Sequence, residues 1–206
     1  VTMFKSKEKA KKAAFQKEAL VHLDALYGVA LRLVKNERDA EDLVQDTYLK
    51  AYSHFDKYQQ GTNCKAWLFK ILTNTFINRY RKKQKERTFL VEDDDRPLYE
   101  RFAASTPHPL DRHFDDEEAL FHTVFGDEVR EALEQVPTEF RMVVLLADLE
   151  GFAYKEIAEI LAVPVGTVMS RLYRGRRMLE KALLSFGTRY NYVNVPPEKL
   201  RDSRID

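Results

Sequence analysis

The stretch YKEIAEILAVPVGTVMSRLYRGRRMLEKALL, residues 154–184, predicts two helices that meet at a tight turn. Four residues of its first half recur at the i, i+3, i+4, i+7 spacing of a single helix face: Tyr154, Ile157, Ala158 and Leu161. Pro164 ends this pattern, because proline biases the residue before it away from the helical region and fits well in a first helical turn. We therefore expect a second helix to start there.

The second of these helices has a distinctive outward side. Val165, Val168 and Leu172 recur at i, i+3, i+7 and are expected to point inward. The outward side then carries five residues: Met169, Ser170, Tyr173, Arg174 and Arg177. A helix of this kind fits the major groove of DNA. Paired amphipathic helices are also common in all-α proteins, so a merely solvated face is the alternative at this point.

Length and composition are those of a globular chain. The 206 residues suggest one or two domains, and 44% apolar residues are enough for real cores. The 34 basic and 33 acidic residues nearly cancel, so the overall charge does not indicate a nucleic-acid partner. The charge is clustered, however. Basic residues concentrate at 79–87 and 171–177, and the acidic run 92–95 lies between them.

The single cysteine, Cys64, excludes an intramolecular disulfide and a cysteine-based zinc cluster within the chain. We expect no metal site, no cofactor and a reducing, cytoplasmic location. The most apolar continuous stretch, 142–147, is far shorter than a bilayer-spanning helix, and no apolar signal region follows the lysine-rich start. Neither export nor membrane insertion is expected.

Helical periodicity is strong over residues 15–85 and again over 127–184, whereas strand-like alternation is nearly absent. The intervening stretch contains three prolines, the acidic run and no sustained apolar stripe, which is typical of a linker. We predict an all-α protein with helical domains at 1–87 and 121–187, a flexible linker at 88–120 and a C-terminal tail at 188–206. A linker of this length lets two domains sit far apart on a large partner.

The segment DAEDLVQDTYLKAYSHF, residues 39–55, predicts a helix with one broad apolar stripe and one acidic side. The stripe contains Ala40, Leu43, Val44, Tyr48, Ala51, Tyr52 and Phe55. The acidic side contains Asp39, Glu41, Asp42, Gln45 and Asp46. Acidic residues near a helix start are favoured by the helix dipole, so simple helix stabilisation remains an alternative to partner binding.

The next segment, residues 57–85, contains a Gly-Thr-Asn turn that leads into a helix with Trp67, Leu68, Ile71, Leu72 and Thr75 on its apolar side. The opposite side forms a single ridge of hydrogen-bonding groups: Lys70, Asn74, Asn78 and Arg81. Amides, basic residues and nearby aromatic rings are the chemistry needed to hold an unstacked base and follow a phosphate backbone. The alternative is a capped helix with a solvated face and a structural Trp67.

Three motifs, in this order and at these separations, resemble the extracytoplasmic-function (ECF) group of bacterial RNA polymerase sigma factors. They are DAEDLVQDTYLKAY at 39–52, YQQGTNCKAWLFKILTNTFINRYRKKQ at 58–84 and EGFAYKEIAEILAVPVGTVMSRLYRGRR at 150–177. The resemblance covers about residues 15–185. It implies a region 2 helical bundle and a region 4 helix-turn-helix domain, joined by a linker that threads toward the polymerase active centre and RNA exit path.

The resemblance also implies three sets of binding residues. The surface for core polymerase, which would meet the β′ coiled coil, contains Asp39, Asp42, Gln45 and Asp46. The −10 promoter element would have a flipped base captured by Tyr58, Asn63, Lys65 and Asn74, with its upstream edge and phosphates near Asn78, Arg79 and Arg81. The −35 element would be read by Met169, Ser170, Tyr173 and Arg174, with phosphates held by Arg171 and Arg177. The β flap is a further expected contact of core polymerase.

Two departures from the family pattern narrow the resemblance. Many members carry lysine or arginine where Met169 stands, so the −35 preference is expected to differ. Gln60 and Gly61 alter the loop, and the segment from Tyr58 onward looks closest to the branch that answers thiol-oxidative stress. In that branch the partner is an anti-sigma factor with a zinc-cysteine centre. Cys64 alone cannot supply a reversible intramolecular switch, so the sensor thiols would belong to that partner.

The expected function is that of a promoter-specificity subunit in a stress response, which binds core polymerase, recognises the −35 and −10 elements and promotes DNA melting. An ordinary transcription regulator is the main alternative, and the polar ridge and long linker argue against it. A nucleotide enzyme is disfavoured, because glycine-rich phosphate loops, HExxH and paired cysteines are absent and His108 and His113 lie in the linker. An anti-sigma or adaptor protein would lack a DNA-reading face.

Overall fold

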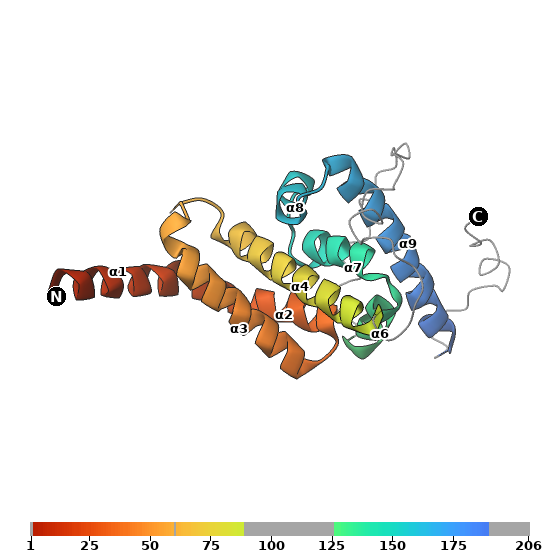
Figure 1. Ribbon diagram of the computed structural model, residues 1–206. Coiled ribbons are helices and arrows are strands. Elements are labelled where there is room, and N and C mark those ends of the chain that lie inside the picture. Colours follow the sequence, from red (N-terminus) through yellow and green to blue (C-terminus); the bar gives the residue numbers. More distant parts are fainter. Residues whose placement is uncertain (1, 60, 89–125, 190–206) are drawn as a thin grey trace.

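The computed structural model describes residues 2–59, 61–88 and 126–189, and these ranges consist of helices joined by short turns, with no strand (Figure 1). The first block, residues 2–88, contains α1 (Thr2–Ala19), η1 (Leu20–His22), α2 (Leu23–Val34), α3 (Glu37–His54), η2 (Phe55–Lys57) and α4 (Cys64–Thr88). The second block, residues 126–189, contains α6 (Gly126–Gln135), α7 (Thr138–Val144), the π-helical η3 (Leu145–Leu149), α8 (Tyr154–Leu161) and α9 (Val165–Arg189). The all-α prediction is confirmed. Most of the predicted linker, with His108 and His113, and the end of the chain lie outside the described residues.

The start of α3 is set by a left-handed residue and a capping side chain. Lys35 ends α2 with φ of 66°, and the Asn36 side chain then accepts a hydrogen bond from the Asp39 N–H at 3.1 Å. The predicted stripe on α3 is buried at Ala40, Leu43 and other positions of the same face. This orientation leaves the acidic side of α3 outside the core.

Aromatic rings fasten the end of α1 to the rest of the first block. Phe15 packs edge to face against Tyr48, Tyr52 and Phe55, with ring centroids 5.1–6.1 Å apart. The Tyr48 hydroxyl donates a hydrogen bond to the Ala19 carbonyl oxygen at 3.0 Å. Burial of this hydroxyl raises the pKa of Tyr48 to about 12, so it remains a donor at neutral pH.

The predicted helix pair of the second block is present as α8 and α9. Ala162 takes a left-handed conformation with φ of 53°, and Val163 N–H donates to the Ala158 carbonyl oxygen at 3.0 Å, which closes the end of α8. Ile157, Ala158 and Val168 are buried as the spacing predicts. Tyr154 and Val165 differ from the prediction, because their side chains are exposed. Each is the first residue of its helix, where no neighbouring segment covers it.

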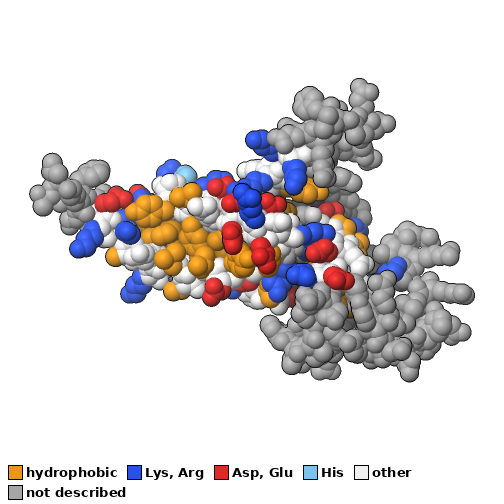
Figure 2. All heavy atoms as spheres, turned by 90° about the horizontal axis from the view of Figure 1, so that it is seen from below, with side chains coloured by type: hydrophobic (Ala, Val, Ile, Leu, Met, Phe, Trp, Pro, Cys, Tyr) orange, Lys and Arg blue, Asp and Glu red, His pale blue; other side chains and the backbone are white. Residues whose placement is uncertain are grey.

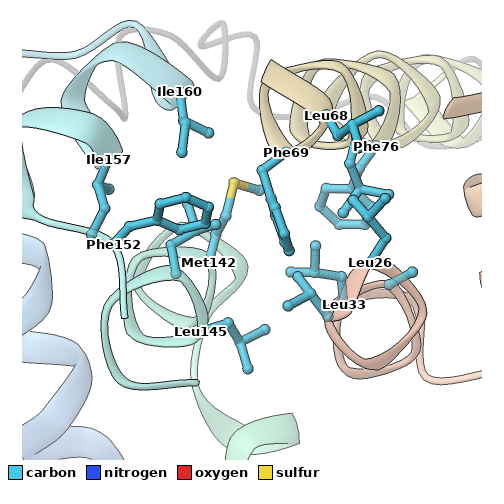
Figure 3. Packing of buried hydrophobic residues seen from close by; sticks show 14 of the residues in the cluster. Leu26, Leu33, Leu68, Phe69, Phe76, Met142, Leu145, Phe152, Ile157 and Ile160 are labelled. Carbon is cyan, nitrogen blue, oxygen red and sulfur yellow. The ribbon is translucent and has the colours of Figure 1, made fainter. Parts of the chain in front are cut away.

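The two blocks pack against each other instead of lying apart, as Figure 1 shows for α4 and α8. Phe69 of α4 meets Phe152, just before α8, edge to face with centroids 5.2 Å apart. Figure 3 shows Phe69 and Met142 between the labelled side chains of the two blocks. Arg141 of α7 also donates to the Arg32 carbonyl oxygen at the end of α2, at 3.1 Å. Apolar side chains on both facing surfaces account for this packing.

Candidate nucleic-acid interface

One side of α4 presents a row of polar side chains to solvent, as the spacing predicts. This polar row consists of Lys70, Asn74, Asn78 and Arg81, all of which are exposed. The opposite side of α4 is held in the core by Leu68 and Leu72, which are fully buried. The row therefore offers amide and cationic groups along a helix whose position is fixed by packing on its other side.

Tyr58 lies in the core, in contrast to the surface position expected of a base-capturing residue. Its ring stacks on Phe55 with centroids 5.6 Å apart and lies 4.8 Å from the Trp67 ring. Its hydroxyl donates to the Thr62 carbonyl oxygen at 2.8 Å, and burial raises its pKa above the usual value. The side chain is 8% exposed, so its visible role here is to shape the loop before α4.

Asn63 and Lys65, at the start of α4, both contact the second block. The Asn63 carbonyl oxygen Oδ1 accepts a hydrogen bond from Ala66 N–H at 3.0 Å, while its Nδ2 donates to Glu156 Oε1 at 2.7 Å. Lys65 Nζ lies 3.0 Å from Glu150 Oε2 and donates to the Glu150 carbonyl oxygen at 2.9 Å. The same ammonium lies 5.0 Å from the centre of the Phe152 ring, within cation–π range.

The acidic side of α3 is exposed at Asp39, Asp42 and Gln45, and half-buried at Asp46. Arg79 of α4 pairs with the Asp46 carboxylate and donates to the Asp42 carbonyl oxygen at 3.0 Å. A residue expected at the −10 element is thus bound to residues expected at core polymerase. The two surfaces adjoin each other where α3 and α4 pack.

The outward side of α9 contains four of the five residues predicted for it: Met169, Tyr173, Arg174 and Arg177. We call these four the α9 face. Met169 and Tyr173 are 37% and 44% exposed, and Arg177 reaches Glu180 at 3.2 Å. A thioether, a phenol and two guanidinium groups can contact base edges and phosphates together.

Ser170 and Arg171 are both buried, although Ser170 was predicted on the outward side of the helix and Arg171 as a phosphate contact. Ser170 is 8% exposed and its hydroxyl donates to the Thr167 carbonyl oxygen at 3.1 Å. Arg171 is 2% exposed. Burial lowers the pKa of Arg171 to about 10, and the charge of Glu139 partly offsets that effect, so the guanidinium stays charged at neutral pH. These positions turn toward the interior of the second block because α9 packs closely on α7.

Glu150 and Glu156 are site residues that the sequence did not indicate. They contact the first block across 85 and 93 positions of the chain, which no helical periodicity reveals. A local signal existed for Glu156 alone, because its Oε2 accepts a hydrogen bond from Ala153 N–H at 2.9 Å and caps α8. Its contact with Asn63 depends on packing between the blocks.

Among the residues described by the structure, no three His, Cys, Asp or Glu side chains are grouped as a metal site would require. The helices in the described ranges are too short or too polar for any of them to cross a membrane. On the face that Figure 2 shows, acidic and basic side chains lie beside the apolar ones. The lone thiol of Cys64 is buried at the start of α4, and burial raises its pKa. Thiol reactivity is therefore suppressed at this position.

Two family models match the chain, one for each block. The model described as "Sigma-70 region 2" matches residues 20–86, and the model described as "Sigma-70, region 4" matches residues 126–179. These matches contain the polar row of α4 and the α9 face. They leave the segment between residues 86 and 126 unmatched.

Two curated relatives have related sequences. The ECF RNA polymerase sigma factor SigE of Mycolicibacterium smegmatis is 37% identical over 79% of this chain. The matched region covers only 58% of the length of that relative. The ECF RNA polymerase sigma factor EcfG of Rhodopseudomonas palustris is 36% identical over 81% of this chain and 83% of its own length.

Two solved structures are also similar. The sigma factor RpoE of Bartonella quintana, in complex with the anti-sigma factor NepR, has a TM-score of 0.61 and 30% identity over 82% of this chain and 96% of its own. CnrH in complex with the cytosolic domain of CnrY has a TM-score of 0.56 and 25% identity over 84% of this chain and 89% of its own.

Proposed function

The chain belongs to the ECF group of the sigma-70 family, whose function is promoter recognition and transcription initiation by RNA polymerase, and we propose how its surfaces divide that work. Members of the family are transcription regulators, and we propose that this chain carries out no covalent reaction. One observation carries the proposal. Two separate exposed faces with nucleic-acid chemistry, the polar row of α4 and the α9 face, occur on one chain.

We assign recognition of the −35 element to the α9 face. Arg174 is exposed and carries a planar fork of donors that matches guanine in the major groove. Tyr173 and Met169 lie on the same face and add a phenol and a thioether that can contact the bases beside it. Arg177 has its guanidinium near Glu180 at the surface, which suits a phosphate contact more than a base contact.

We assign the −10 element to the polar row and the start of α4. Taking a base out of the stack costs a few kcal/mol, so a site that traps it must offer edge hydrogen bonds and stacking in return. Asn74 is exposed at the middle of the row and supplies both a donor and an acceptor. Asn63 and Lys65 lie at the helix start, while Asn78, Arg79 and Arg81 continue toward its far end.

We assign binding of core polymerase to the acidic side of α3, which is formed by Asp39, Asp42, Gln45 and Asp46. Asp39, Asp42 and Gln45 are exposed and Asp46 is half-buried, on a helix whose other side is anchored in the core. A basic partner helix would be recognised there by charge complementarity. We also propose a contact of the second block with the β flap, and a cytoplasmic location, where polymerase and promoter DNA lie.

We further propose that an anti-sigma factor controls this chain in a stress response. Two similar structures are sigma factors bound to anti-sigma factors, which supports a partner of that class. Assignment to the thiol-oxidative-stress branch, with a zinc-binding partner, rests on the segment from Tyr58 onward. The buried Cys64 thiol is consistent with redox sensing by the partner. Metal analysis of an anti-sigma factor that co-purifies with this chain would test the assignment to this branch. A partner without zinc would contradict the assignment.

Run-off transcription tests the proposed function directly. Purified core polymerase is given promoter-containing genomic fragments with and without this chain, and the products are sequenced. We expect a set of transcripts with defined start sites that depend on the added chain. The control is the same chain with Arg174→Ala and Asn74→Ala, which keeps both cores intact. Transcript patterns that do not change when the chain is added would overturn the proposal.

A further inference from the structure

Helix α1 (Thr2–Ala19) ends where the match with the region 2 family model begins, at residue 20. We propose that α1 is a further DNA-binding element, which contacts the phosphate backbone of promoter DNA at the downstream edge of the −10 element. Contacts of this kind add affinity without reading the sequence. The inference rests on the proposed assignment of the −10 element to α4.

Polar contacts hold the middle of α1 against the end of α3 and the start of η2. Lys11 Nζ lies 2.6 Å from Asp56 Oδ2, and the same ammonium lies 5.1 Å from the centre of the Tyr52 ring. The Tyr52 hydroxyl donates to Glu8 Oε1 at 2.8 Å. These contacts fix α1 beside the segment that leads into α4.

A row of aromatic rings connects α1 to the loop before α4. The buried Phe15 ring meets the Phe55 ring edge to face, with centroids 5.1 Å apart. Phe55 in turn stacks on Tyr58, with centroids 5.6 Å apart. Because all three rings are buried, packing sets the position of α1 relative to the loop at the start of the proposed −10 site.

The charges of α1 are sorted between its two sides over residues 8–19, whose side chains the structure describes. Lys9, Lys12 and Lys17 are exposed. The two acidic residues of this part are turned to the block, because Glu8 accepts from Tyr52 and Glu18 is half-buried. The outward side is therefore basic, and a polyanion is the ligand that fits it by charge.

The length of this basic side suits a nucleic-acid backbone. Lys9 and Lys17 are eight positions apart, which corresponds to about 12 Å along a helix axis. One strand of DNA advances about 3.4 Å for each phosphate, so the three lysines span about three or four phosphates. The exposed Gln16 adds an amide that can also donate to a phosphate oxygen.

The direction of α4 determines which edge of the −10 element lies near α1. Figure 1 shows α1 projecting beyond the end of the first block at which α4 begins, away from the second block. We assign Arg81, toward the far end of α4, to the upstream edge, and Asn63 and Lys65, at its start, to the flipped base. A strand that follows α4 from Arg81 to Asn63 reaches α1 after the −10 element. An acidic protein would fit the lysines by charge alone, but this continuity favours DNA.

The first experiment compares two variants of the full chain, each assembled with core polymerase. Lys9→Gln with Lys12→Gln removes two charges from α1 and keeps residues that form helices well. The matched control is Lys35→Gln with Arg38→Gln, which removes the same charge from exposed positions around the start of α3. The Lys35–Glu134 pair lost in the control is exposed, so it contributes little to stability. Affinity for promoter DNA is then measured over a range of salt concentrations.

We expect the α1 variant to bind promoter DNA about tenfold more weakly than the control at low salt. The slope of log affinity against log salt should be smaller by about two, because each lost phosphate contact lowers it by about one. Discrimination between promoter and random DNA should be the same in both variants, because phosphates carry no sequence information. Equal affinities and equal salt slopes in the two variants would overturn the proposal.

A second experiment locates α1 on the DNA and keeps all the lysines in place. An iron chelate that cleaves nearby DNA is attached at Ala13→Cys, an exposed position of α1, while Cys64 is buried. We expect cleavage within a few base pairs of the downstream edge of the −10 element. The same chelate at Glu131→Cys, exposed on α6, should leave that stretch uncut. No cleavage from Ala13→Cys, or equal cleavage from both positions, would overturn the proposal.

Run-off transcription decides the proposed function separately. Chain-dependent transcripts without cleavage from Ala13→Cys would reject the role of α1 alone. Transcripts that do not depend on the chain would reject the proposed function and this inference with it. If the α1 variant captures less core polymerase, while the assembled enzyme binds DNA as the control does, the partner of α1 is a protein and the proposal is overturned.

Discussion

Gly175 of α9 lies so close to Val144 of α7 that a Cβ atom at Gly175 would come within 2.6 Å of Val144 Cγ2. That Cβ atom would also lie 3.2 Å from the Phe140 carbonyl oxygen. The absence of a side chain at Gly175 therefore sets how closely α9, which presents the α9 face, packs on the core of the second block.

Gly175→Ala should destabilise the second block even though alanine is the better helix former. Overpacking of this kind costs about 1–3 kcal/mol in the free energy of unfolding. Chemical denaturation would measure it. Gly166→Ala is the matched control, because a Cβ at Gly166 meets nothing within 4 Å. The control should gain about 0.5–1 kcal/mol from helix propensity. Equal effects at the two glycines would contradict the packing argument.

Arg171→Ala should act on stability. Its guanidinium is buried, so truncation to alanine takes away the polar group that its neighbours contact. It also removes the positive charge that interacts with Glu139. Loss of a buried charged group of this kind costs about 2–4 kcal/mol. Thermal or urea unfolding of the chain is the measurement, with Arg177→Ala at the exposed surface as the control. A stable Arg171→Ala protein that binds DNA poorly would instead support the phosphate contact predicted from the sequence.

Arg174→Ala should leave stability unchanged and reduce promoter discrimination. A bidentate contact with a base is worth about 1–3 kcal/mol of preference over the wrong base. Competition between promoter DNA and random duplex DNA measures that preference in the assembled holoenzyme. Lys12→Ala, which removes one exposed positive charge from α1, is the control. Equal losses on promoter and random DNA would make Arg174 a phosphate anchor.

Asn74→Ala should impair melting while duplex −35 binding stays intact. Unstacking a base costs a few kcal/mol, and hydrogen bonds to the edge of the trapped base offset that cost. The variant would lose these hydrogen bonds, so the unstacked state would be less stable. Permanganate footprinting of the −10 region reports unpaired thymines directly. Reactivity at the wild-type level would remove Asn74 from the proposed site. Gln59→Ala, exposed in the loop before α4, provides a neighbouring amide as control.

Asp42→Lys should weaken capture of core polymerase. The Asp42 side chain is exposed on the acidic side of α3, and charge reversal there would oppose a basic partner surface. Co-purification with core polymerase at moderate salt measures the effect. Glu131→Lys on the second block reverses the same charge away from α3. Equal recovery of core polymerase with both variants would contradict the assignment.

The local parts of the fold follow from short-range patterns. Pro164 marks the turn between α8 and α9, and the spacing of the polar row places Asn74 and Asn78 on the exposed side of α4. These features depend on residues within a few turns of one another. Helical periodicity captures them because one face of each helix is anchored in the core.

The misplaced site residues depend on packing that periodicity cannot describe. Arg171 follows two exposed or outward-predicted positions, yet the close approach of α9 to α7 encloses it. Tyr58 is buried because the loop folds its ring between Phe55 and Trp67. The Lys65–Glu150 pair joins segments 85 positions apart, and nothing in either segment indicates the other.

The pairing of Phe69 with Phe152 gives the arrangement of the blocks a temperature dependence. Separating these rings would expose apolar surface to water, which raises the heat capacity. Hydrophobic association weakens on cooling, so the contact between the two blocks is held less firmly in the cold than at moderate temperature. A drop in temperature would therefore weaken this contact without any change in ligand, partner or covalent state.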